Sequence, residues 1–555
     1  MKSKMTGAQY IARTVSDYGI THVFYMEAIL RRTLVEMEKL GISRVLTHSE
    51  KAAAYMADGF ARAGNRLGLC MAQSVGAANL AAGLQDAYLG RSPVIAFTGR
   101  KPPLHQYRNS YQEILHNTMY QAVTKYNVEV GVVEQLPHLL LQAFREATTG
   151  SPGPAHLDFL GYEGNLTDEA EAELVLEVER EYTRMPARRP VPEEADLRRV
   201  AEALGNAERP VLVVGRGAIV SGAHAEVLSL ARHLGAPVIV SMDGKSIISE
   251  DDPLYVGPAG AYCAPCANEV LAESDLVFFV GCSTGDQVTK NWTLPPVGFP
   301  VIQIDINPAE IGRSYPGAIG LLGDVRVGLA ALIAELGGNA RSAKNGWAER
   351  VRGVVAKWRA SVEPQRSAEA VPIRTERLCA DISAELPEGA IVVADTGYSA
   401  IWAGTLIDLV KPGQLFLRAA GSLGWGFPAS LGAKCAQPSR PVICFSGDGA
   451  FWYHLSELET AMRWNINTVT VINNNSVLGQ CQLGIRRAYR KEEGREEQQY
   501  RFTDANFARI AEDLGAVGMR VERPSEIRPA IRRALSLDRP VVVDVATEPE
   551  SHPHM

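Results

Sequence analysis

Residues 441–479 read PVICFSGDGAFWYHLSELETAMRWNINTVTVINNNSVLG, and this stretch decides the fold. The apolar run PVICFS predicts a buried strand that leads directly into a Gly-Asp-Gly turn at 447–449. A helical pattern follows, and TVTVI predicts a second strand that ends at three asparagines, 473–475. Asp448 and Asn475 are 27 residues apart, which suffices for the helix and return strand of a right-handed βαβ crossover. Both side chains should therefore emerge at the carboxyl ends of parallel strands, where α/β sheets bind ligands.

The same alternation of short β-branched runs and amphipathic stretches fills the rest of the chain, which at 555 residues is long enough for roughly three or four domains. It occurs in three blocks. A stretch rich in Glu, Arg and Pro at 163–194 resembles a linker, and residues 338–372 lack a strong apolar pattern. We predict an α/β protein of three doubly wound parallel-sheet domains, at 1–165, 190–340 and 370–548.

Charge and hydropathy exclude several classes of partner. The formal net charge is −7, with no basic stripe or arm, so nothing attracts nucleic acid or an anionic membrane by charge. The start lacks the apolar region of a signal peptide, and no stretch has the length of a membrane span. We expect a cytoplasmic protein that acts on small molecules.

The cysteines look structural. Most of the eight lie in apolar runs, and only Cys263 and Cys266 form a CxxC pair. A single pair with no second pair and no histidines is weak support for a metal or redox site, so core packing is the favoured interpretation.

The chemistry of Asp448 and Asn475 suggests a magnesium site. A carboxylate and an amide oxygen are hard ligands, and Mg²⁺ commonly completes its octahedron with water and phosphate oxygens. Taken alone, a Gly-Asp-Gly sequence is usually only a turn. Its combination with the asparagines one crossover later predicts a metal-bound diphosphate.

The stretch from GDG to NNNSVLG resembles the metal motif of thiamine-diphosphate-dependent enzymes. In that family the aspartate, the second asparagine of a pair and a backbone carbonyl two residues later hold the metal. The resemblance assigns Mg²⁺ to Asp448, Asn475 and the carbonyl of Val477, with Gly479 fixing which asparagine is meant. The amides of Gly449 and Ala450, at the start of the helix, would face the diphosphate.

Members of this family also need a glutamate from another domain, which drives the aminopyrimidine of the cofactor to the form that deprotonates C2 of the thiazolium. THSEKAAAYMADGFAR in the first block offers Glu50, between a predicted strand and an Ala-rich helix. Apolar surroundings should raise its pKa and keep its proton available. Without the family, Glu50 would be an ordinary first-turn glutamate favoured by the helix dipole.

Two glycine-rich segments resemble further parts of the cofactor site. AAGSLGWGFPASLGA is similar to the segment that bends the cofactor, with Leu423 as the apolar wedge between its rings and the Gly421 carbonyl as acceptor for the 4′-amino group. ADTGYSAIW is similar to a segment that contacts the diphosphate, which places Gly397, Tyr398 and Ser399 near it. The alternative is that these glycines only allow helices and sheet to pack closely.

Nearly the whole chain resembles the acetolactate (acetohydroxyacid) synthase subgroup. YQEILHN is similar to its Phe-Gln-Glu segment, which makes Gln112 a candidate pocket residue. The resemblance implies a pyrimidine-binding first domain, a middle domain, and a diphosphate-binding third domain. Related middle domains bind FAD, ADP or nothing, and FAD is not the outcome we favour.

Three departures from the synthases concern the substrate. Ser283 stands where they have an arginine that grips the carboxylate of the second 2-oxo acid, and Gly484 stands where they have a tryptophan that selects the acceptor. Loss of a carboxylate clamp and opening of a large volume predict an altered acceptor. Glu27 replaces a glycine in a loop that faces the substrate in the family; it is either a second ionisable group at the reaction centre or a surface glutamate.

The family resemblance implies decarboxylation or carboligation of a 2-oxo acid or a related dicarbonyl, in a homodimer or homotetramer whose sites lie between subunits. Hydrolytic cleavage of a diketone with the same cofactor is an alternative. Release of carbon dioxide distinguishes the two, because only the reaction of a 2-oxo acid releases it. A catalytically silent cofactor-binding homologue is another, but Glu50, Asp448 and Asn475 are all present.

Overall fold

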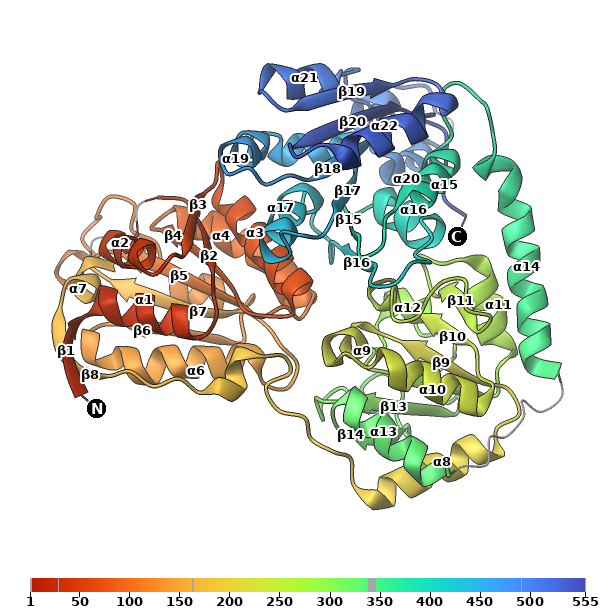
Figure 1. Cartoon of the computed structure of the whole chain (residues 1–555), viewed down its shortest axis with the longest axis horizontal. Coiled ribbons are helices and arrows are strands. Elements are labelled where there is room, and N and C mark those ends of the chain that lie inside the picture. The colour runs from red at the N-terminus through yellow and green to blue at the C-terminus, as the bar shows by residue number, and fades with distance from the viewer. Residues whose placement is uncertain (1, 28, 162–163, 338–345, 491, 555) are drawn as a thin grey trace.

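The computed structural model describes residues 2–27, 29–161, 164–337, 346–490 and 492–554. The described chain contains three six-stranded sheets, all parallel, each wrapped by helices (Figure 1). The predicted fold class, three doubly wound parallel-sheet units, is confirmed. In the described residues no helix has the length and apolar character needed to cross a membrane.

The first sheet has the order β3-β2-β4-β5-β7-β6. Its strands are β2 (His22–Tyr25), β3 (Ser43–Leu46), β4 (Gly68–Gln73), β5 (Val94–Arg100), β6 (Tyr126–Val130) and β7 (Ala155–Leu160). Its helices are α1 (Gly7–Asp17), α2 (Arg31–Lys39), α3 (Glu50–Gly64), α4 (Gly76–Leu89), α5 (His116–Tyr120), α6 (Leu136–Thr148) and α7 (Asn165–Asp168).

The second sheet has the order β11-β10-β9-β12-β13-β14. Its strands are β9 (Pro210–Val214), β10 (Val238–Val240), β11 (Tyr255–Pro258), β12 (Leu276–Val280), β13 (Val301–Asp305) and β14 (Ile319–Leu322). Its helices are α8 (Glu194–Asn206), α9 (Arg216–Ser221), α10 (His224–Leu234), α11 (Pro265–Glu273), α12 (Asp286–Thr289) and α13 (Val325–Leu336).

The third sheet has the order β16-β15-β17-β18-β20-β19. Its strands are β15 (Ile391–Ala394), β16 (Leu415–Arg418), β17 (Val442–Gly447), β18 (Val469–Asn474), β19 (Val517–Val521) and β20 (Val541–Ala546). Its helices are α15 (Thr375–Glu385), α16 (Tyr398–Leu406), α17 (Gly426–Ala436), α18 (Asp448–Phe451), α19 (Glu457–Arg463), α20 (Gly479–Tyr489), α21 (Phe507–Asp513) and α22 (Pro524–Ser536).

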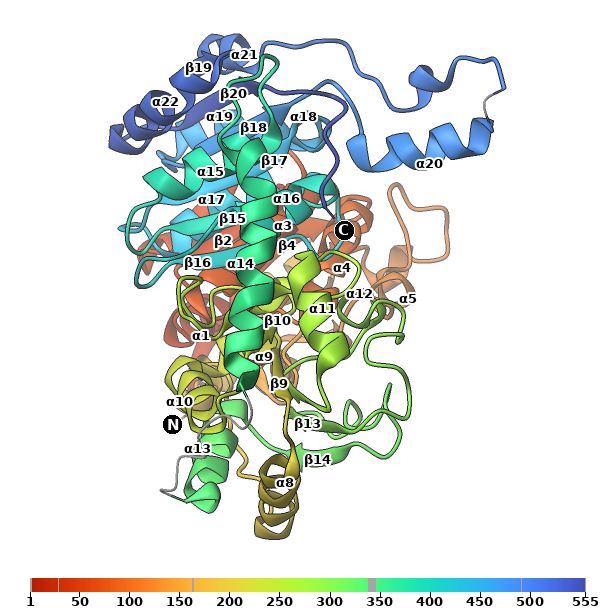
Figure 2. The ribbon, with the colours of Figure 1, turned by 90° about the vertical axis from the view of Figure 1, so that its right-hand side faces the viewer.

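Two stretches of weak apolar pattern carry regular structure. Within 163–194, interpreted as a linker, β8 (Glu171–Val175) pairs antiparallel with β1 (Lys2–Thr6). The linker interpretation was wrong here because Glu and Ala alternate on an exposed edge, and only Leu174 of β8 is buried. Within 338–372, α14 (Trp347–Arg366) buries only a narrow apolar stripe and runs along one side of the molecule (Figure 2).

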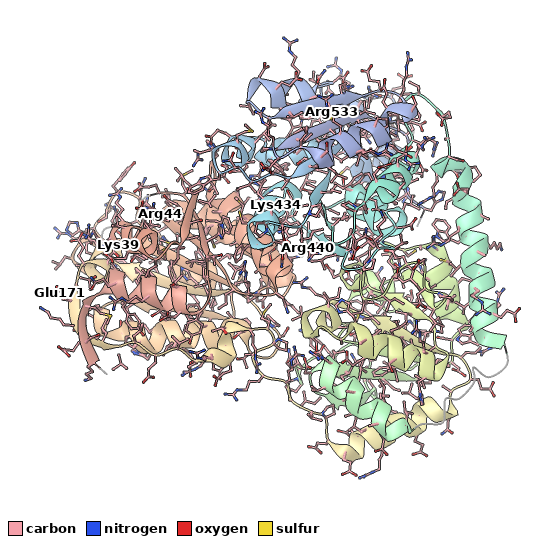
Figure 3. All side chains as sticks on the ribbon, viewed as in Figure 1. Lys39, Arg44, Glu171, Lys434, Arg440 and Arg533 are labelled. Carbon is pink, nitrogen blue, oxygen red and sulfur yellow. The ribbon has the colours of Figure 1, made fainter. Side chains whose placement is uncertain are left out.

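The first and third domains share one hydrophobic core, in which α3 lies against α17. Glycines allow the close approach, because a Cβ on Gly59 would lie 2.0 Å from the Ala429 carbonyl oxygen and one on Gly432 would lie 1.9 Å from that of Met56. The charged side chains labelled in Figure 3, such as Lys39 and Arg533, are spread over these two domains. The packing of α3 on α17 joins the first and third domains into one body.

Candidate active site

The predicted metal edge forms at the carboxyl ends of two neighbouring strands. β17 and β18 pair in parallel with Gly447 opposite Asn473, and Asp448 begins α18 directly after β17. A cavity of about 400 Å³ opens at this edge. All eleven residues assigned to cofactor or metal from the sequence line it: Gly397, Tyr398, Ser399, Gly421, Leu423, Asp448, Gly449, Ala450, Asn475, Val477 and Gly479.

Asp448 is a buried carboxylate, 3% exposed. Burial raises its pKa to about 7, although hydrogen bonds from nearby backbone amides partly offset this. It forms no ion pair in the part of the chain that the structure describes. A divalent cation would stabilise its ionised form, and the oxygens of Asp448, Asn475 and the Val477 carbonyl fit the donor preference of Mg²⁺. The described residues hold no cluster of three or more His, Cys, Asp or Glu side chains suited to a metal.

The three asparagines have different roles. Thr375 donates a 3.2 Å hydrogen bond to Asn473, and Asn474 donates to the Ala505 carbonyl and to Asp544 at 2.8 and 2.9 Å. Asn473 and Asn475 line the cavity, whereas Asn474 points into the protein. The alternation of side chains along a strand puts Asn473 and Asn475 on the cavity side and Asn474 on the other. Asn475, which accepts a 3.3 Å hydrogen bond from the Val477 amide, stands at the position assigned from the family motif.

The wall of the cavity demands small residues at two assigned positions. A Cβ on Gly449 would lie 2.8 Å from Leu478 and 2.9 Å from the ring of Phe502. Gly397 has φ of +72°, a conformation that favours glycine, and precedes α16. The backbone is thereby open to an anionic ligand at the beginning of both helices.

The three catalytic candidates of the first domain lie elsewhere. Glu50 begins α3, is half-buried, and accepts a 3.1 Å hydrogen bond from Asn79. Gln112 has φ of +61° and accepts a 3.3 Å hydrogen bond from Gln73, at the end of β4. Among the described residues, no side chain from the first domain lines the cofactor cavity. Within one chain, Glu50 thus lies outside the described lining of the cavity that contains Asp448.

Glu27 is a surface residue in the isolated chain. Its side chain is 46% exposed and forms a bidentate ion pair with Arg31 at 2.6 and 3.1 Å. It follows β2, so it lies at the same edge of the first sheet as Glu50, which follows β3. Its proposed place at a reaction centre stays a prediction.

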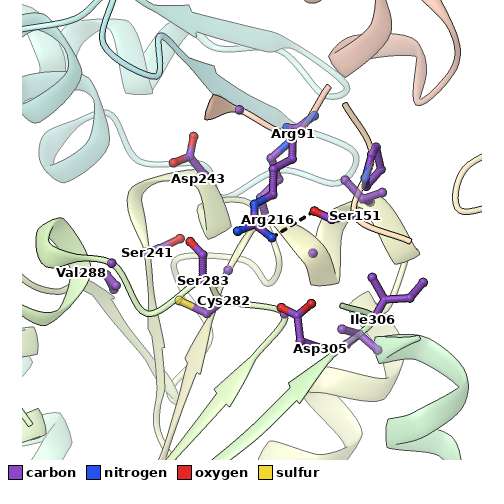
Figure 4. A pocket seen from close by; sticks show the side chains of 18 of the residues that line it. Arg91, Ser151, Arg216, Ser241, Asp243, Cys282, Ser283, Val288, Asp305 and Ile306 are labelled. Atoms are coloured by element: carbon purple, nitrogen blue, oxygen red, sulfur yellow. Dashed lines mark hydrogen bonds between the residues drawn. The ribbon is translucent and has the colours of Figure 1, made fainter. Parts of the chain in front are cut away.

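A second cavity, of about 340 Å³, lies at the carboxyl ends of the strands of the middle domain (Figure 4). Arg216, Asp243, Ser283 and Asp305 are gathered around it. The Nε of Arg216 is buried without a hydrogen-bond partner among the described residues, and burial raises the pKa of Asp305 to about 6. A cation and a carboxylate at the mouth of a parallel sheet suit the phosphate and ribose of a nucleotide.

An ion pair between Arg418 and Asp243 lies between the two cavities. Arg418 donates to Asp243 at 2.7 Å and to Gln287 at 2.7 Å, and both Arg418 and Gln287 line both cavities. Sequence reasoning missed this pair, because Arg418 belongs to the third domain and Asp243 to the middle domain.

The structure locates the two positions where the sequence departs from the synthases. Ser283 lines the middle cavity and is not among the residues that line the cofactor cavity. Gly484 is exposed on α20, and a Cβ there would meet no described atom within 4 Å. Both observations leave an enlarged acceptor space as a prediction.

Cys263 and Cys266 are buried free thiols. Cys266 donates to the Val256 carbonyl at 3.4 Å, and Cys263 accepts from Asn268 at 3.2 Å. Burial raises their pKa values to about 11 and about 12. These contacts fit the packing interpretation, since a reactive thiol needs a lowered pKa.

Comparison with known proteins agrees with this arrangement. Sequence profiles of thiamine pyrophosphate enzymes match the N-terminal TPP binding domain at 5–120, the central domain at 197–332 and the C-terminal TPP binding domain at 395–545. A protein of Methanocaldococcus jannaschii named "Probable acetolactate synthase large subunit" is 31% identical, covering 98% of this chain and 92% of its own. The acetolactate synthase large subunit of Corynebacterium glutamicum is 30% identical over 98% and 86%, and that of Haemophilus influenzae is 28% identical over 99% and 96%.

Proposed function

Because this chain belongs to the thiamine pyrophosphate enzyme family and is an acetolactate synthase-like, thiamine-diphosphate-dependent decarboxylase/carboligase, we propose that it acts on a 2-oxo acid and passes the product to an acceptor other than the small 2-oxo acid of the synthases. The observation that carries the proposal is the cavity of about 400 Å³ beside Asp448, which brings all eleven assigned residues together. The altered acceptor rests on the resemblance, in which Ser283 and Gly484 stand where the synthases have an arginine and a tryptophan.

When bound, thiamine diphosphate supplies a carbanion at C2 of its thiazolium that can attack a carbonyl carbon. Asp448, Asn475 and the Val477 carbonyl would hold Mg²⁺ and, through it, the diphosphate. Leu423 would support the bent cofactor, and the Gly421 carbonyl would accept from the 4′-amino group. Glu50 would hold a proton at N1′ of the pyrimidine.

Glu50 would come from a second copy of the chain. The support is that residues from the first domain are missing from the described lining of the cofactor cavity, while Glu50 begins a helix at the edge of its own sheet. We therefore propose a homodimer or homotetramer with sites between subunits. Gln112 and Glu27, at that same sheet edge, would join Glu50 there.

The middle cavity would bind a mononucleotide such as ADP in preference to FAD. Arg216 and Asp305 suit a phosphate and a ribose, and the Arg418–Asp243 ion pair stands at the side facing the cofactor cavity. Acid extraction of the purified protein followed by mass spectrometry tests this assignment. Recovery of FAD with its visible absorbance would contradict it.

The reaction is tested by incubating pure protein with thiamine diphosphate, Mg²⁺ and a panel of 2-oxo acids and diketones. Carbon dioxide release with a coupled product, identified by mass spectrometry, is the expected result. Cleavage of a diketone without carbon dioxide would favour the hydrolytic alternative. No turnover by protein with verified cofactor binding would favour a silent homologue.

A further inference from the structure

The loop between β16 and α17, which carries Gly421 and Leu423, is fastened by a carboxylate from another domain. Asp86, near the end of α4 in the first domain, accepts hydrogen bonds from the amides of Ala420, Gly421 and Ser422 at 2.8, 3.2 and 3.0 Å. Its side chain is fully buried. Three amides converging on one carboxylate fix the course of the backbone.

A second carboxylate fastens the other end of the same loop. Asp395, at the end of β15, accepts from the amides of Gly424 and Gly426 at 3.0 and 2.6 Å. It also accepts from the amide of Thr396 at 2.8 Å, and it too is fully buried. The third domain supplies this fastening itself.

Leu423 is the residue between the two sets of hydrogen bonds. The amides on its N-terminal side bond to Asp86, and those on its C-terminal side bond to Asp395. Gly421 and Leu423 face the cofactor cavity, while Ser422 and Gly424 between and beside them are buried. Both groups expected to touch the cofactor rings therefore depend on these carboxylates for their placement.

Asp86 is itself held rigidly. Arg62 donates to Asp86 at 3.1 Å and forms a bidentate pair with Asp58 at 2.8 and 2.7 Å. The same guanidinium donates to the Arg418 carbonyl at 2.8 Å and lies 4.8 Å from the centre of the Trp425 ring. The buried cluster of Asp58, Arg62 and Asp86 in α3 and α4 thus contacts both the start of the loop, at Arg418, and its end, at Trp425.

We propose that Asp86 is a positioning residue for the reaction: through it, the first domain of a chain sets the cofactor loop in the third domain of the same chain. This inference rests on the proposed function, because it assigns the loop to the bent cofactor. In a dimer the first domain would then act twice, giving Glu50 to the partner's site and Asp86 to its own.

Hydrogen–deuterium exchange of the cofactor-free protein tests the fastening directly. In Asp86→Asn, amides of the peptide spanning 420–422 should exchange roughly 10- to 100-fold faster, the range expected for losing hydrogen bonds to a charged group. Asp86→Glu keeps the charge beside Arg62 and displaces the acceptor oxygens, so it should show the same change if Asp86→Asn does not fold. Glu250→Gln is the matched control, since it breaks the buried ion pair with Lys245, which lines neither cavity.

Exchange of the C2 proton of the bound cofactor, read by NMR after acid quenching, tests the effect on chemistry. The Asp86 variants should slow it by about tenfold or more, while cofactor affinity by calorimetry changes much less and Glu250→Gln leaves both unchanged. Unchanged protection of 420–422, or loosened protection with C2 exchange as fast as wild type, would overturn the proposal. If the wild-type protein itself did not accelerate C2 exchange, the proposed function would fail, and the amide data would still decide whether Asp86 fastens the loop.

Discussion

Asn474 and Asn475 are adjacent in sequence, and their side chains leave the end of β18 on opposite sides. Asn474 donates to Asp544 at 2.9 Å inside the third domain, whereas Asn475 lines the cofactor cavity beside Asp448. One asparagine is thus part of the core and the next is available to a ligand. This separation makes the assignment of the metal ligand testable within a single tripeptide.

Asn475→Ala should raise the Mg²⁺ concentration needed for cofactor binding by roughly tenfold or more, since it removes a proposed metal ligand. It should lower stability little, because the hydrogen bond that its side chain loses among the described residues is a 3.3 Å bond from the Val477 amide. Asn474→Ala should lower the free energy of unfolding by about 1–3 kcal/mol, because Asp544 loses a buried donor. Calorimetric titration with Mg²⁺ and thermal unfolding distinguish the two. The reverse pattern would move the metal ligand to Asn474.

Asp448→Ala should abolish measurable binding of thiamine diphosphate, because the diphosphate would lose its metal and Arg418, the one Lys or Arg in the described lining, is paired with Asp243. Calorimetry in the presence of Mg²⁺ measures the affinity, with circular dichroism to verify folding. Asp513→Ala, at an exposed position of α21, is the control and should bind as wild type. Full affinity in Asp448→Ala would refute the metal assignment.

Glu50→Gln should slow C2 deprotonation by roughly 10²–10⁴-fold, the loss typical of general acid–base catalysis, with a much smaller effect on cofactor affinity. If the sites lie between subunits, mixing Glu50→Gln with Asp448→Ala should restore part of the activity, because a mixed dimer contains one intact site. Each variant alone is the control. Recovery near zero after verified subunit exchange would place both residues in the same subunit's site.

Gly484→Trp should narrow the range of acceptors towards small molecules, because an indole would refill space that the glycine leaves open. Product spectra with a panel of acceptors measure this change. Gly353→Trp on α14 is a matched control, since a Cβ there also meets no described atom within 4 Å. An unchanged spectrum would show that Gly484 does not face the acceptor.

His156 should make stability fall in acid. It is fully buried in the first domain, stacked on Tyr120 at 3.6 Å between ring centres, and burial lowers its pKa to about 3. The folded state keeps it neutral while the unfolded chain takes up a proton below about pH 6.5, so its contribution is full above that pH. It should be lost at about 1.4 kcal/mol per pH unit between roughly pH 6.5 and 3.

Denaturant unfolding as a function of pH measures this loss. The slope below about pH 6.5 should be smaller in His156→Gln than in wild type, whereas His138→Gln, at an exposed position of α6, should keep the wild-type slope. Equal slopes in wild type and His156→Gln would show that His156 accepts its proton without cost in the folded state.

The sequence alone determined the fold class and that Asp448 and Asn475 would lie at one sheet edge. Strand periodicity, the Gly-Asp-Gly turn and the spacing from Asp448 to Asn475 are local properties, and a right-handed crossover converts that spacing into proximity with no further information. The family resemblance extended the prediction to Gly397, Gly421 and Leu423, which line the same cavity. Periodicity was too weak to predict the structure in 163–194 and 338–372. The first contains an exposed strand and the second a helix with a narrow apolar stripe, and both bury too few apolar side chains to give a clear pattern.

Only the tertiary structure decided which distant residues meet. Asp86 accepts a hydrogen bond from the amide of Ala420, 334 residues away in the sequence. In the sequence it looks like any acidic residue of a helix, and the packing of α3 against α17 brings the two segments together. The Arg418–Asp243 ion pair between the two cavities likewise joins two domains. The position of Glu50 also depends on the tertiary structure. Its motif can be recognised locally, but only the packing of the domains shows that it lies away from the cofactor cavity of its own chain. Contacts of this kind depend on the packing of whole elements, which no local pattern encodes.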